Sequence, residues 1–145
     1  MKILILNGPN LNLLGARKPD VYGHKNLDEV NEFIRGYFKR VTLEFFQTNH
    51  EGVMIDQLQQ AEKDFDAVVI NPGALTHYSY ALRDAIEAID IPVSEVHISN
   101  VHNREDFRNK SVISDVCSGT VSGFGVYGYV MALQALAHKA KRNTK

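Results

Sequence analysis

The chain has 145 residues with 16 Lys and Arg against 17 Asp and Glu, which gives a formal net charge of −1. A balance this close argues against a nucleic-acid partner or a membrane-surface role, and no apolar run approaches the length of a membrane span. The length indicates one domain over residues 1–145, the single cysteine (Cys117) excludes an internal disulfide, and the short apolar run before Asn7 predicts no export signal and hence a cytoplasmic protein.

Apolar strand patterns alternate with amphipathic helix patterns along the chain. In chain order, the predicted elements are a strand over 2–7, a helix over 27–40, a strand over 41–47, a helix over 51–63, a strand over 67–70, a helix over 77–89, a strand over 92–97, a short strand within 111–122 and a helix over about 124–142. The first helix has a start signal, because Asn26 followed by Glu29 forms a capping box. The second helix is expected to place on one side Val53, Ile55, Leu58 and Ala61.

This alternation predicts the fold class and the place of the site. Continuous apolar strands separated by amphipathic helices are typical of a parallel sheet that is covered on both faces. We therefore expect an α/β fold, a flavodoxin-like doubly wound five-stranded parallel sheet with helices on both faces. In such sheets ligands bind beyond the carboxyl ends of the strands, so residues just after those ends are the candidates for chemistry.

A long loop follows the first strand, from Asn7 to Gly23, and its glycines and prolines exclude a regular element for most of its length. Loops of this length in a compact domain are usually functional. Tyr22 lies five residues after Arg17, and a nearby guanidinium favours the ionised form of a tyrosine. The pair suits a general base on a loop that closes as a lid, and an ordinary loop tyrosine at the sheet edge is the alternative.

Histidines and amides follow two later strands. Asn71 and His77 come after the third strand, and His97 ends the fourth. With the loop tyrosine, these groups suit a site for a polyhydroxylated anion that contains a proton-transfer pair. A structural role for His97 and a capping or surface role for His77 are the alternatives. Glu95, on the fourth strand, is expected to hold a neighbouring histidine or arginine.

The segment after the fourth strand adds groups that suit an anion. Ile98 and Ser99 offer a backbone N–H and a hydroxyl to a carboxylate, and Arg108 could clamp the same ligand in bidentate fashion. A solvated surface charge is the alternative for this arginine and for Asp84 on the outer side of its helix. The histidines lack the surrounding acids and cysteines of a metal ligand set, so we expect no metal.

The glycine pattern of Gly123, Gly125 and Gly128 matches the dinucleotide fingerprint as a string. It opens the final helix, however, and the chain ends before an acidic residue could reach a ribose, so we interpret these glycines as close packing of that helix. A flavin is the other cofactor that the expected fold suggests. The first loop has no serine or threonine between Gly8 and Tyr22 to bond a phosphate, so we expect no cofactor.

Six strings carry a family resemblance: Asn7-Gly-Pro-Asn-Leu-Asn-Leu-Leu-Gly15, Pro19-x-x-Tyr22-Gly23, Asn71-Pro-Gly-Ala74, Thr76-His77, Ala81-Leu-Arg-Asp84 and Glu95-Val-His-Ile-Ser-Asn100. In this order they are far more specific than the glycine pattern. Over nearly its whole length the chain resembles the type II 3-dehydroquinate dehydratases. The resemblance implies that 3-dehydroquinate loses water to give 3-dehydroshikimate through an enolate, with neither metal nor Schiff base.

Catalytic roles follow from the resemblance, position by position. Tyr22 matches the base that takes the proton next to the ketone, and Arg17 matches the arginine that keeps this tyrosine ionised and closes with the lid. His97 matches the general acid. Asn12 matches the residue that holds, through water, the oxygen that becomes the enolate, which is an oxyanion-type contact.

Substrate contacts follow in the same way. Asn71 and His77 match residues that bond ring hydroxyls, and Arg108 matches a residue that bonds another ring hydroxyl. The N–H of Ile98 and the side chain of Ser99 match the groups that hold the carboxylate. The substrate is therefore expected to be anchored from the ends of two neighbouring strands.

Assembly is also implied by the resemblance. Asp84 matches a residue that reaches a neighbouring subunit's site, which implies a trimer-built site and a dodecamer of four trimers. Two positions depart from the family pattern, since Lys18 stands where an acid is common and Leu75 where an aromatic residue is frequent. The resemblance leaves open whether the enzyme serves the shikimate pathway or quinate breakdown.

Two other functional classes are weighed against the dehydratase. One is a flavodoxin-like flavin-binding or redox module, which shares the expected fold. The other is a non-catalytic response or scaffold domain, which predicts that the loop carrying Arg17 and Tyr22 is dispensable and leaves the polar cluster at the strand ends unexplained.

Overall fold

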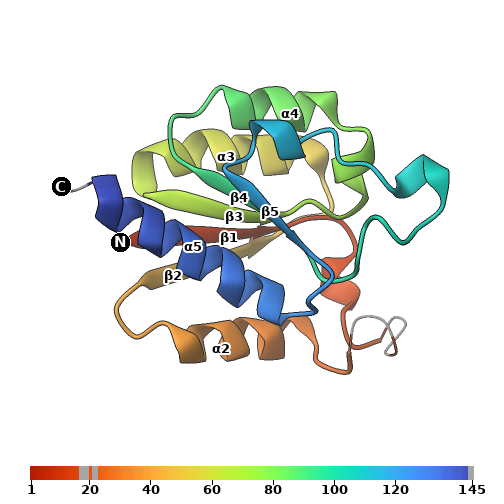
Figure 1. Ribbon diagram of the computed structural model, residues 1–145, viewed down its shortest axis with the longest axis horizontal. Coiled ribbons are helices and arrows are strands. Elements are labelled where there is room, and N and C mark those ends of the chain that lie inside the picture. Colours follow the sequence, from red (N-terminus) through yellow and green to blue (C-terminus); the bar gives the residue numbers. More distant parts are fainter. Residues whose placement is uncertain (17–19, 21–22, 144–145) are drawn as a thin grey trace.

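The computed structural model describes the chain except residues 17–19, 21–22 and 144–145. Five strands of this described part form one parallel sheet in the order β2-β1-β3-β4-β5 (Figure 1). Their bounds are β1 Lys2–Asn7, β2 Thr42–Gln47, β3 Ala67–Asn71, β4 Val93–His97 and β5 Gly119–Ser122. This is the flavodoxin-like strand order, so the expected fold class is confirmed.

Helices cover both faces of the sheet, as Figure 1 shows. Their bounds are α2 Leu27–Tyr37, α3 Glu51–Asp64, α4 Tyr80–Glu87 and α5 Tyr127–Asn143. Helices α2 and α5 pack on one face, and α3 and α4 on the other. In the described part of the chain, none of the helices combines the length and the apolar character needed to cross a membrane.

Strand β1 shows why the strands are apolar throughout. Ile3 and Ile5 belong to the core layer under α2 and α5, whereas Leu4 and Leu6 belong to the layer under α3 and α4. All four side chains are at most 3% exposed. Because successive side chains point to opposite faces, a sheet covered on both faces needs an unbroken apolar run.

The helix starts agree with the sequence in one case and differ in another. Helix α2 has the expected capping box, in which Asn26 accepts from the Glu29 N–H and Glu29 accepts from the Asn26 N–H. Helix α4 does not start at His77, as the sequence suggested. It starts at Tyr80, after Ser79, which accepts from the N–H of the third helical residue.

The stretch before α4 is a separate 3₁₀ helix, Gly73–His77, so His77 ends one element instead of beginning the next. This 3₁₀ helix places His77 beyond the carboxyl end of β3. In α3, Leu58 and Ala61 are buried as expected and Ile55 is partly buried, but Met54 is buried in place of Val53, which is 37% exposed. The expected apolar side of that helix was therefore wrong only at Val53, because the weak amphipathic pattern allowed either residue.

Close packing explains only part of the glycine pattern around the start of α5, because a Cβ at Gly125 would meet open space. A Cβ on Gly128 would lie 3.4 Å from Val121 Cγ1 and 3.5 Å from Val96 Cγ1, which is ordinary contact distance, so α5 packs directly on β4 and β5 at this position. Gly123 and Gly125 have φ of +92° and +61°, the left-handed region that glycine tolerates. These two glycines turn the chain from β5 into α5.

Candidate active site

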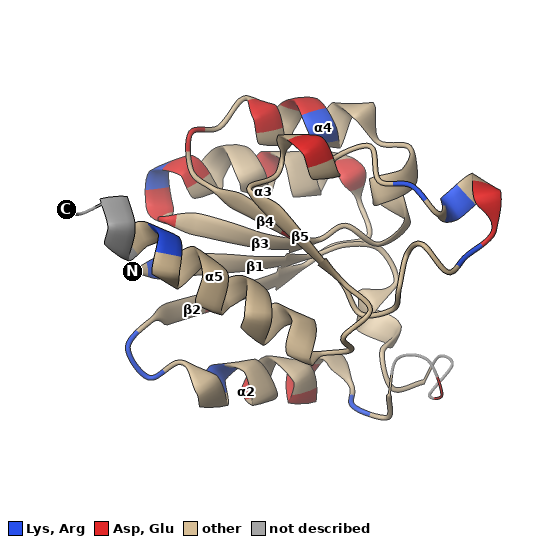
Figure 2. Ribbon diagram, in the orientation of Figure 1, with Lys and Arg blue, Asp and Glu red and all other residues tan. Residues whose placement is uncertain are grey.

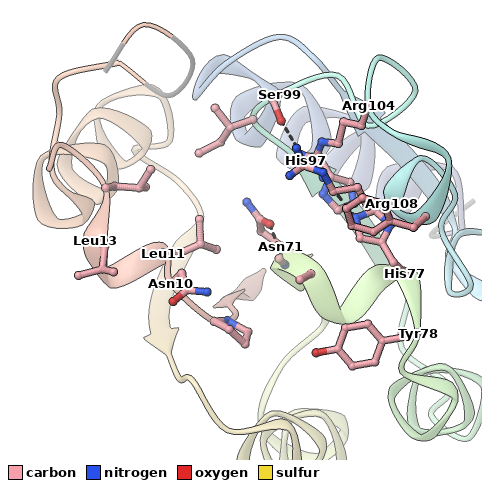
Figure 3. Close-up of a pocket in the computed structure, with 16 residues that line it drawn as sticks. Asn10, Leu11, Leu13, Asn71, His77, Tyr78, His97, Ser99, Arg104 and Arg108 are labelled. Carbon is pink, nitrogen blue, oxygen red and sulfur yellow. Dashed lines mark hydrogen bonds between the residues drawn. The ribbon is translucent and has the colours of Figure 1, made fainter. Parts of the chain in front are cut away.

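A cavity of about 250 Å³ lies at the carboxyl ends of β1, β3 and β4 (Figure 3). Its wall is formed by Pro9, Asn10, Leu11, Leu13, Leu14, Asn71, Gly73, Ala74, His77, Tyr78, His97, Ile98, Ser99, Arg104, Phe107 and Arg108. The wall is apolar on the side of the first loop and polar on the side of β3 and β4. Its place agrees with the rule that ligands bind beyond the carboxyl ends of parallel strands.

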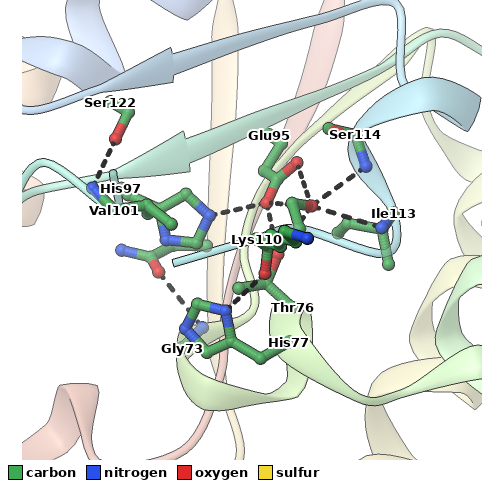
Figure 4. A network of polar contacts seen from close by, with 12 residues as sticks. Gly73, Thr76, His77, Glu95, His97, Val101, Lys110, Ile113, Ser114 and Ser122 are labelled. Carbon is green, nitrogen blue, oxygen red and sulfur yellow. Dashed lines mark hydrogen bonds and ion pairs between the residues drawn. The ribbon is translucent and has the colours of Figure 1, made fainter. Parts of the chain in front are cut away.

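His97 is the last residue of β4 and is 4% exposed. Its Nε2 lies 2.6 Å from Oε1 of Glu95, which is fully buried on the same strand (Figure 4). A carboxylate accepts hydrogen bonds, so this contact places a proton on Nε2 and leaves Nδ1 as the nitrogen for chemistry. The expectation that Glu95 holds a neighbouring histidine agrees with this geometry.

Two hydroxyl groups, in addition to His97, contact the Glu95 carboxylate. Thr76 Oγ1 donates to Oε1, and Ser111 Oγ lies 3.0 Å from both oxygens. Burial raises the pKa of Glu95, but the hydrogen bond and charge of His97 and these hydroxyls outweigh it and hold the pKa below its ordinary value. Glu95 is therefore an ionised, fully buried anchor for the imidazole.

Ser111 is itself fixed by the backbone. Its Oγ accepts from the N–H groups of Ile113 at 3.2 Å and Ser114 at 3.0 Å, so its single proton is left for the carboxylate. The segment is also tied to the 3₁₀ helix, because the Val112 N–H donates to the Thr76 carbonyl at 2.7 Å. These bonds hold the hydroxyl in place for Glu95.

His77 has a defined tautomer. Its Nδ1 lies 2.6 Å from the carbonyl oxygen of Lys110, which can only accept, so Nδ1 carries a proton. Its Nε2 lies 3.2 Å from Nη1 of Arg104. Burial, together with the charges of Arg104, His97 and Arg108, lowers the pKa of His77 against the raising effect of the carbonyl. The neutral ring therefore offers Nε2 as an acceptor.

Asn71 is oriented by a buried hydrogen-bond chain. Its Nδ2 donates to the hydroxyl of Tyr129 at 2.9 Å, and this hydroxyl donates to Oδ1 of Asn7 at 2.7 Å. Its Oδ1 accepts from the N–H of Gly73 at 3.2 Å. The amide is thus held with its second N–H left to donate, in the wall of the cavity.

The arginines of the segment after β4 differ in their partners. Arg104 donates through Nη2 to Ser99 Oγ at 2.5 Å, in addition to its contact with His77. Arg108 donates through Nε and Nη2 to the carboxylate of Glu105. Both arginines are partly buried and line the cavity. The polar side of the cavity therefore contains two arginines, of which Arg108 is paired with a neighbouring carboxylate.

Six of the predicted site residues line the cavity: Asn71, His77, His97, Ile98, Ser99 and Arg108. Among the described residues, Asn12 and Asp84 are not part of the wall. Asn12 is exposed, and its Oδ1 lies 3.4 Å from Nε2 of Gln47. Asp84 is exposed on α4, as its position in the helix indicated. Tyr22, Arg17 and Lys18 lie outside the described residues.

The sequence reasoning missed several wall residues. Arg104 was in the right segment, and a second arginine close to Arg108 after a strand end was the available signal. The apolar wall residues Leu11, Leu13 and Tyr78 carry no sequence signal that separates them from core positions. Leu75, which departs from the family pattern, is 4% exposed and packs in the core layer under α3 and α4.

Within the part of the chain that the structure describes, no three His, Cys, Asp or Glu side chains are grouped where they could hold a metal ion. Cys117 is partly buried, and burial, together with Glu95 and Asp115, raises the pKa of its thiol to about 12. Two histidines of the cavity wall, His77 and His97, carry groups with the chemistry for proton transfer.

Comparisons with known proteins give a consistent result. The sequence model of the family described as "Dehydroquinase class II" matches residues 1–137. The chain is 52% identical over 147 aligned residues to a "3-dehydroquinate dehydratase" of Thermotoga neapolitana, covering 100% of both, and 54% identical to one of Chlorobaculum tepidum, covering 97% of this chain and 96% of the relative. The crystal structure of a type II dehydroquinase from Butyrivibrio crossotus has a TM-score of 0.92 at 49% identity, covering 94% of this chain and 97% of that one.

Proposed function

Because the chain belongs to the class II dehydroquinase family, we propose that it is a 3-dehydroquinate dehydratase, a hydro-lyase that converts 3-dehydroquinate into 3-dehydroshikimate. The family drawn from the sequence strings is thereby confirmed. The flavin-binding alternative has no support from the family match. We propose a single dehydroquinase domain over residues 1–145 that works in the cytoplasm, in the shikimate pathway or in quinate breakdown.

The observation that carries this proposal is the arrangement at the end of β4. His97 lines a cavity of the size of a small ring compound and is backed by the ionised carboxylate of Glu95. Asn71, His77 and Ser99 present hydrogen-bonding groups in the same wall. A general acid beside several hydroxyl-binding groups is what dehydration of a cyclic polyol requires.

The proposed reaction begins with removal of a proton from the carbon next to the ketone. The base is Tyr22, ionised beside Arg17. Leu13 and Leu14, which lead into this part of the loop, line the cavity and so bring the chain to its edge. The electron pair of the carbon–hydrogen bond forms the carbon–carbon double bond of the enolate as the carbonyl π electrons move onto oxygen, and Asn12 stabilises this enolate oxygen through water.

The second step is loss of the hydroxyl group. The enolate oxygen re-forms the ketone, and the π pair of the enolate forms the new carbon–carbon double bond. The carbon–oxygen bond breaks as His97 gives its Nδ1 proton to the leaving oxygen, which departs as water. Glu95 stays hydrogen-bonded to Nε2 throughout and balances the charge that the ring carries while both nitrogens are protonated.

Substrate binding uses the rest of the wall. We propose that the Asn71 amide and Nε2 of His77 bond ring hydroxyls, with Arg108 on a further hydroxyl. The N–H of Ile98 and the hydroxyl of Ser99 hold the carboxylate. The fixed amide of Asn71 and the fixed tautomer of His77 support these roles, because both groups reach the ligand already oriented.

We further propose assembly into trimers and a dodecamer of four trimers, in which Asp84 reaches the site of a neighbouring subunit. The exposed position of Asp84 on α4 supports this role. Tyr78 and Tyr80, which are 60% and 67% exposed beside the start of α4, supply apolar area that a subunit contact would cover. Analytical ultracentrifugation of the parent protein tests the proposed state directly.

An ultraviolet assay for the enone product tests the function. The parent should dehydrate 3-dehydroquinate, and Tyr22→Phe and His97→Ala should each lose nearly all activity while keeping the circular dichroism of the parent. Tyr37→Phe and His138→Ala, on exposed helix surfaces, are matched controls and should retain it. An inactive parent would refute the function, and an active Tyr22→Phe variant would refute the base assignment.

Lys18 offers a test of the lid. A lysine where an acid is common adds positive charge close to the proposed base, and we propose that it changes the ionisation of Tyr22 or the rate of closing. The measurement is the pH–rate profile of Lys18→Glu beside the parent. Superimposable profiles would end this hypothesis.

A further inference from the structure

We propose that Arg104 determines the charge specificity of the site, because its guanidinium joins the Ser99 hydroxyl in holding the carboxylate of the substrate. This inference rests on the proposed function and adds a charged group to the carboxylate contacts proposed above. It concerns a residue that the sequence reasoning did not select for the site.

The guanidinium spans the two strand ends that anchor the substrate (Figure 3). Nη2 donates to Ser99 Oγ at 2.5 Å, and Nη1 lies 3.2 Å from Nε2 of His77. Ser99 follows β4, whereas His77 ends the 3₁₀ helix that follows β3. Arg104 therefore lies between a proposed carboxylate contact and a proposed hydroxyl contact.

The donors and acceptors show what Arg104 can do there. A guanidinium only donates, so Ser99 Oγ accepts from Arg104 and keeps its own proton for a ligand. His77 is likewise an acceptor at Nε2, because its Nδ1 proton is committed to the Lys110 carbonyl. These two contacts of Arg104 go to neutral acceptors. A carboxylate that arrives at Ser99 is a stronger acceptor and forms charge-assisted bonds with the same guanidinium.

The position of Arg104 suits this role, because its Nη2 bonds the hydroxyl of Ser99, the proposed carboxylate contact. The Arg108 guanidinium contacts the Glu105 carboxylate through two of its nitrogens, so a neighbouring negative charge already compensates it. Figure 2 shows that basic and acidic residues lie close together in the segment after β4. Arg108 therefore suits the uncharged ring hydroxyl proposed for it. A turn of Arg104 toward the carboxylate also releases Nε2 of His77 to accept from a ring hydroxyl.

The test compares binding of two probes that the enzyme cannot dehydrate in the proposed way. They are quinate, in which the ketone is replaced by a hydroxyl, and its carboxamide, which lacks the negative charge. Isothermal titration calorimetry gives Kd for both probes with the parent, Arg104→Gln, Arg104→Lys and Arg108→Gln. We expect the parent to prefer the carboxylate by about 10- to 100-fold, the range for hydrogen bonds to a charged group.

Arg104→Gln should lose most of this preference, and Arg104→Lys should restore part of it as a point charge. Arg108→Gln is the matched control. It should weaken the binding of both probes, while the preference for the carboxylate over the carboxamide remains. In turnover of 3-dehydroquinate, Arg104→Gln should raise KM far more than it lowers kcat, the pattern of lost uniform binding.

Each remaining result contradicts a stated claim. An Arg104→Gln variant that keeps the preference, or that weakens both probes equally, overturns the inference. A parent that dehydrates 3-dehydroquinate but binds both probes equally overturns it as well and leaves the proposed function intact. A parent that is inert toward 3-dehydroquinate overturns the proposed function, and the inference with it.

Discussion

Replacing Thr76 by valine tests the buried network that supports His97. Thr76 and Glu95 are both fully buried, and the Thr76 hydroxyl donates to the Glu95 carboxylate. Valine has nearly the shape of threonine, so the change removes a hydrogen bond and opens no cavity. The carboxylate keeps its bonds from His97 and Ser111, so it is weakened as an anchor without being left unpaired.

The expected cost follows from the charge on the acceptor. A hydrogen bond to an ionised group contributes about 1.5–3 kcal/mol to stability. We therefore expect Thr76→Val to lower the free energy of unfolding by about 1.5–3 kcal/mol at pH 7. In urea unfolding followed by circular dichroism at one protein concentration, the midpoint should fall while the slope stays unchanged.

The pH dependence separates this cost from ordinary packing. Although burial raises the pKa of Glu95, His97 and the two hydroxyls hold it below the ordinary value. A carboxyl of this kind stabilises the fold above its unfolded-state pKa, and the contribution is lost as the pH falls through the folded-state pKa. Losing the Thr76 bond raises the folded-state pKa. The difference in the free energy of unfolding between variant and parent should therefore be largest at pH 7. It should become smaller as the pH falls below the folded-state pKa of Glu95.

Thr48→Val is the matched control. Thr48 is 7% exposed, and its hydroxyl oxygen accepts a hydrogen bond from the His50 N–H at 3.0 Å, so this bond goes to a backbone group and not to a carboxylate. This variant should cost less, and its cost should not depend on whether the pH lies above or below the folded-state pKa of Glu95. A Thr76→Val cost that is equal to the control, or that stays the same as the pH falls below that pKa, would refute the reasoning about Glu95.

Three further predictions concern other parts of the chain. Cys117, whose thiol has its pKa raised to about 12, should resist alkylation by iodoacetamide at pH 8 in the native state and react readily in urea. Gly8→Ala should destabilise the fold by more than about 2 kcal/mol and lower activity, because its Cβ would lie 2.7 Å from backbone atoms of Pro72, whereas Gly36→Ala, with open space in α2, should stabilise by about 0.5–1 kcal/mol. Asn26→Ala should cost about 1 kcal/mol through loss of the capping box, measured by thermal unfolding, and an unchanged midpoint would contradict that role.

Much of the fold follows from local patterns in the sequence. The run from Ile3 to Leu6 is apolar on successive positions, which indicates a strand buried on both faces, and the capping box at Asn26 marks the start of a helix. The strand ends place Asn71 and His97 at one edge of the sheet, where the structure has the cavity. These features depend on periodicities of a few residues, which the sequence displays directly.

Other features depend on distances that no local pattern records. The 3₁₀ helix that ends at His77 delays α4 until Tyr80, and a helix-like apolar pattern did not reveal that break. Met54, and not Val53, is buried because of how α3 lies on the sheet. The roles of Tyr22 and Arg17 stay predictions, since both lie outside the described residues.

Local patterns in the chain are enough to predict the alternation of strands and helices, the edge of the sheet where the cavity lies and the histidine at the end of β4. The side chains that meet at this edge are set by the packing of the elements in three dimensions. Thr76, Glu95 and Ser111 are far apart in the chain, yet one carboxylate collects both hydroxyls. Hydrogen bonds form only when two atoms come within about 3 Å, so the partners of Glu95 depend on how the strands and turns pack in space. The spacing of these residues along the chain does not reveal that packing.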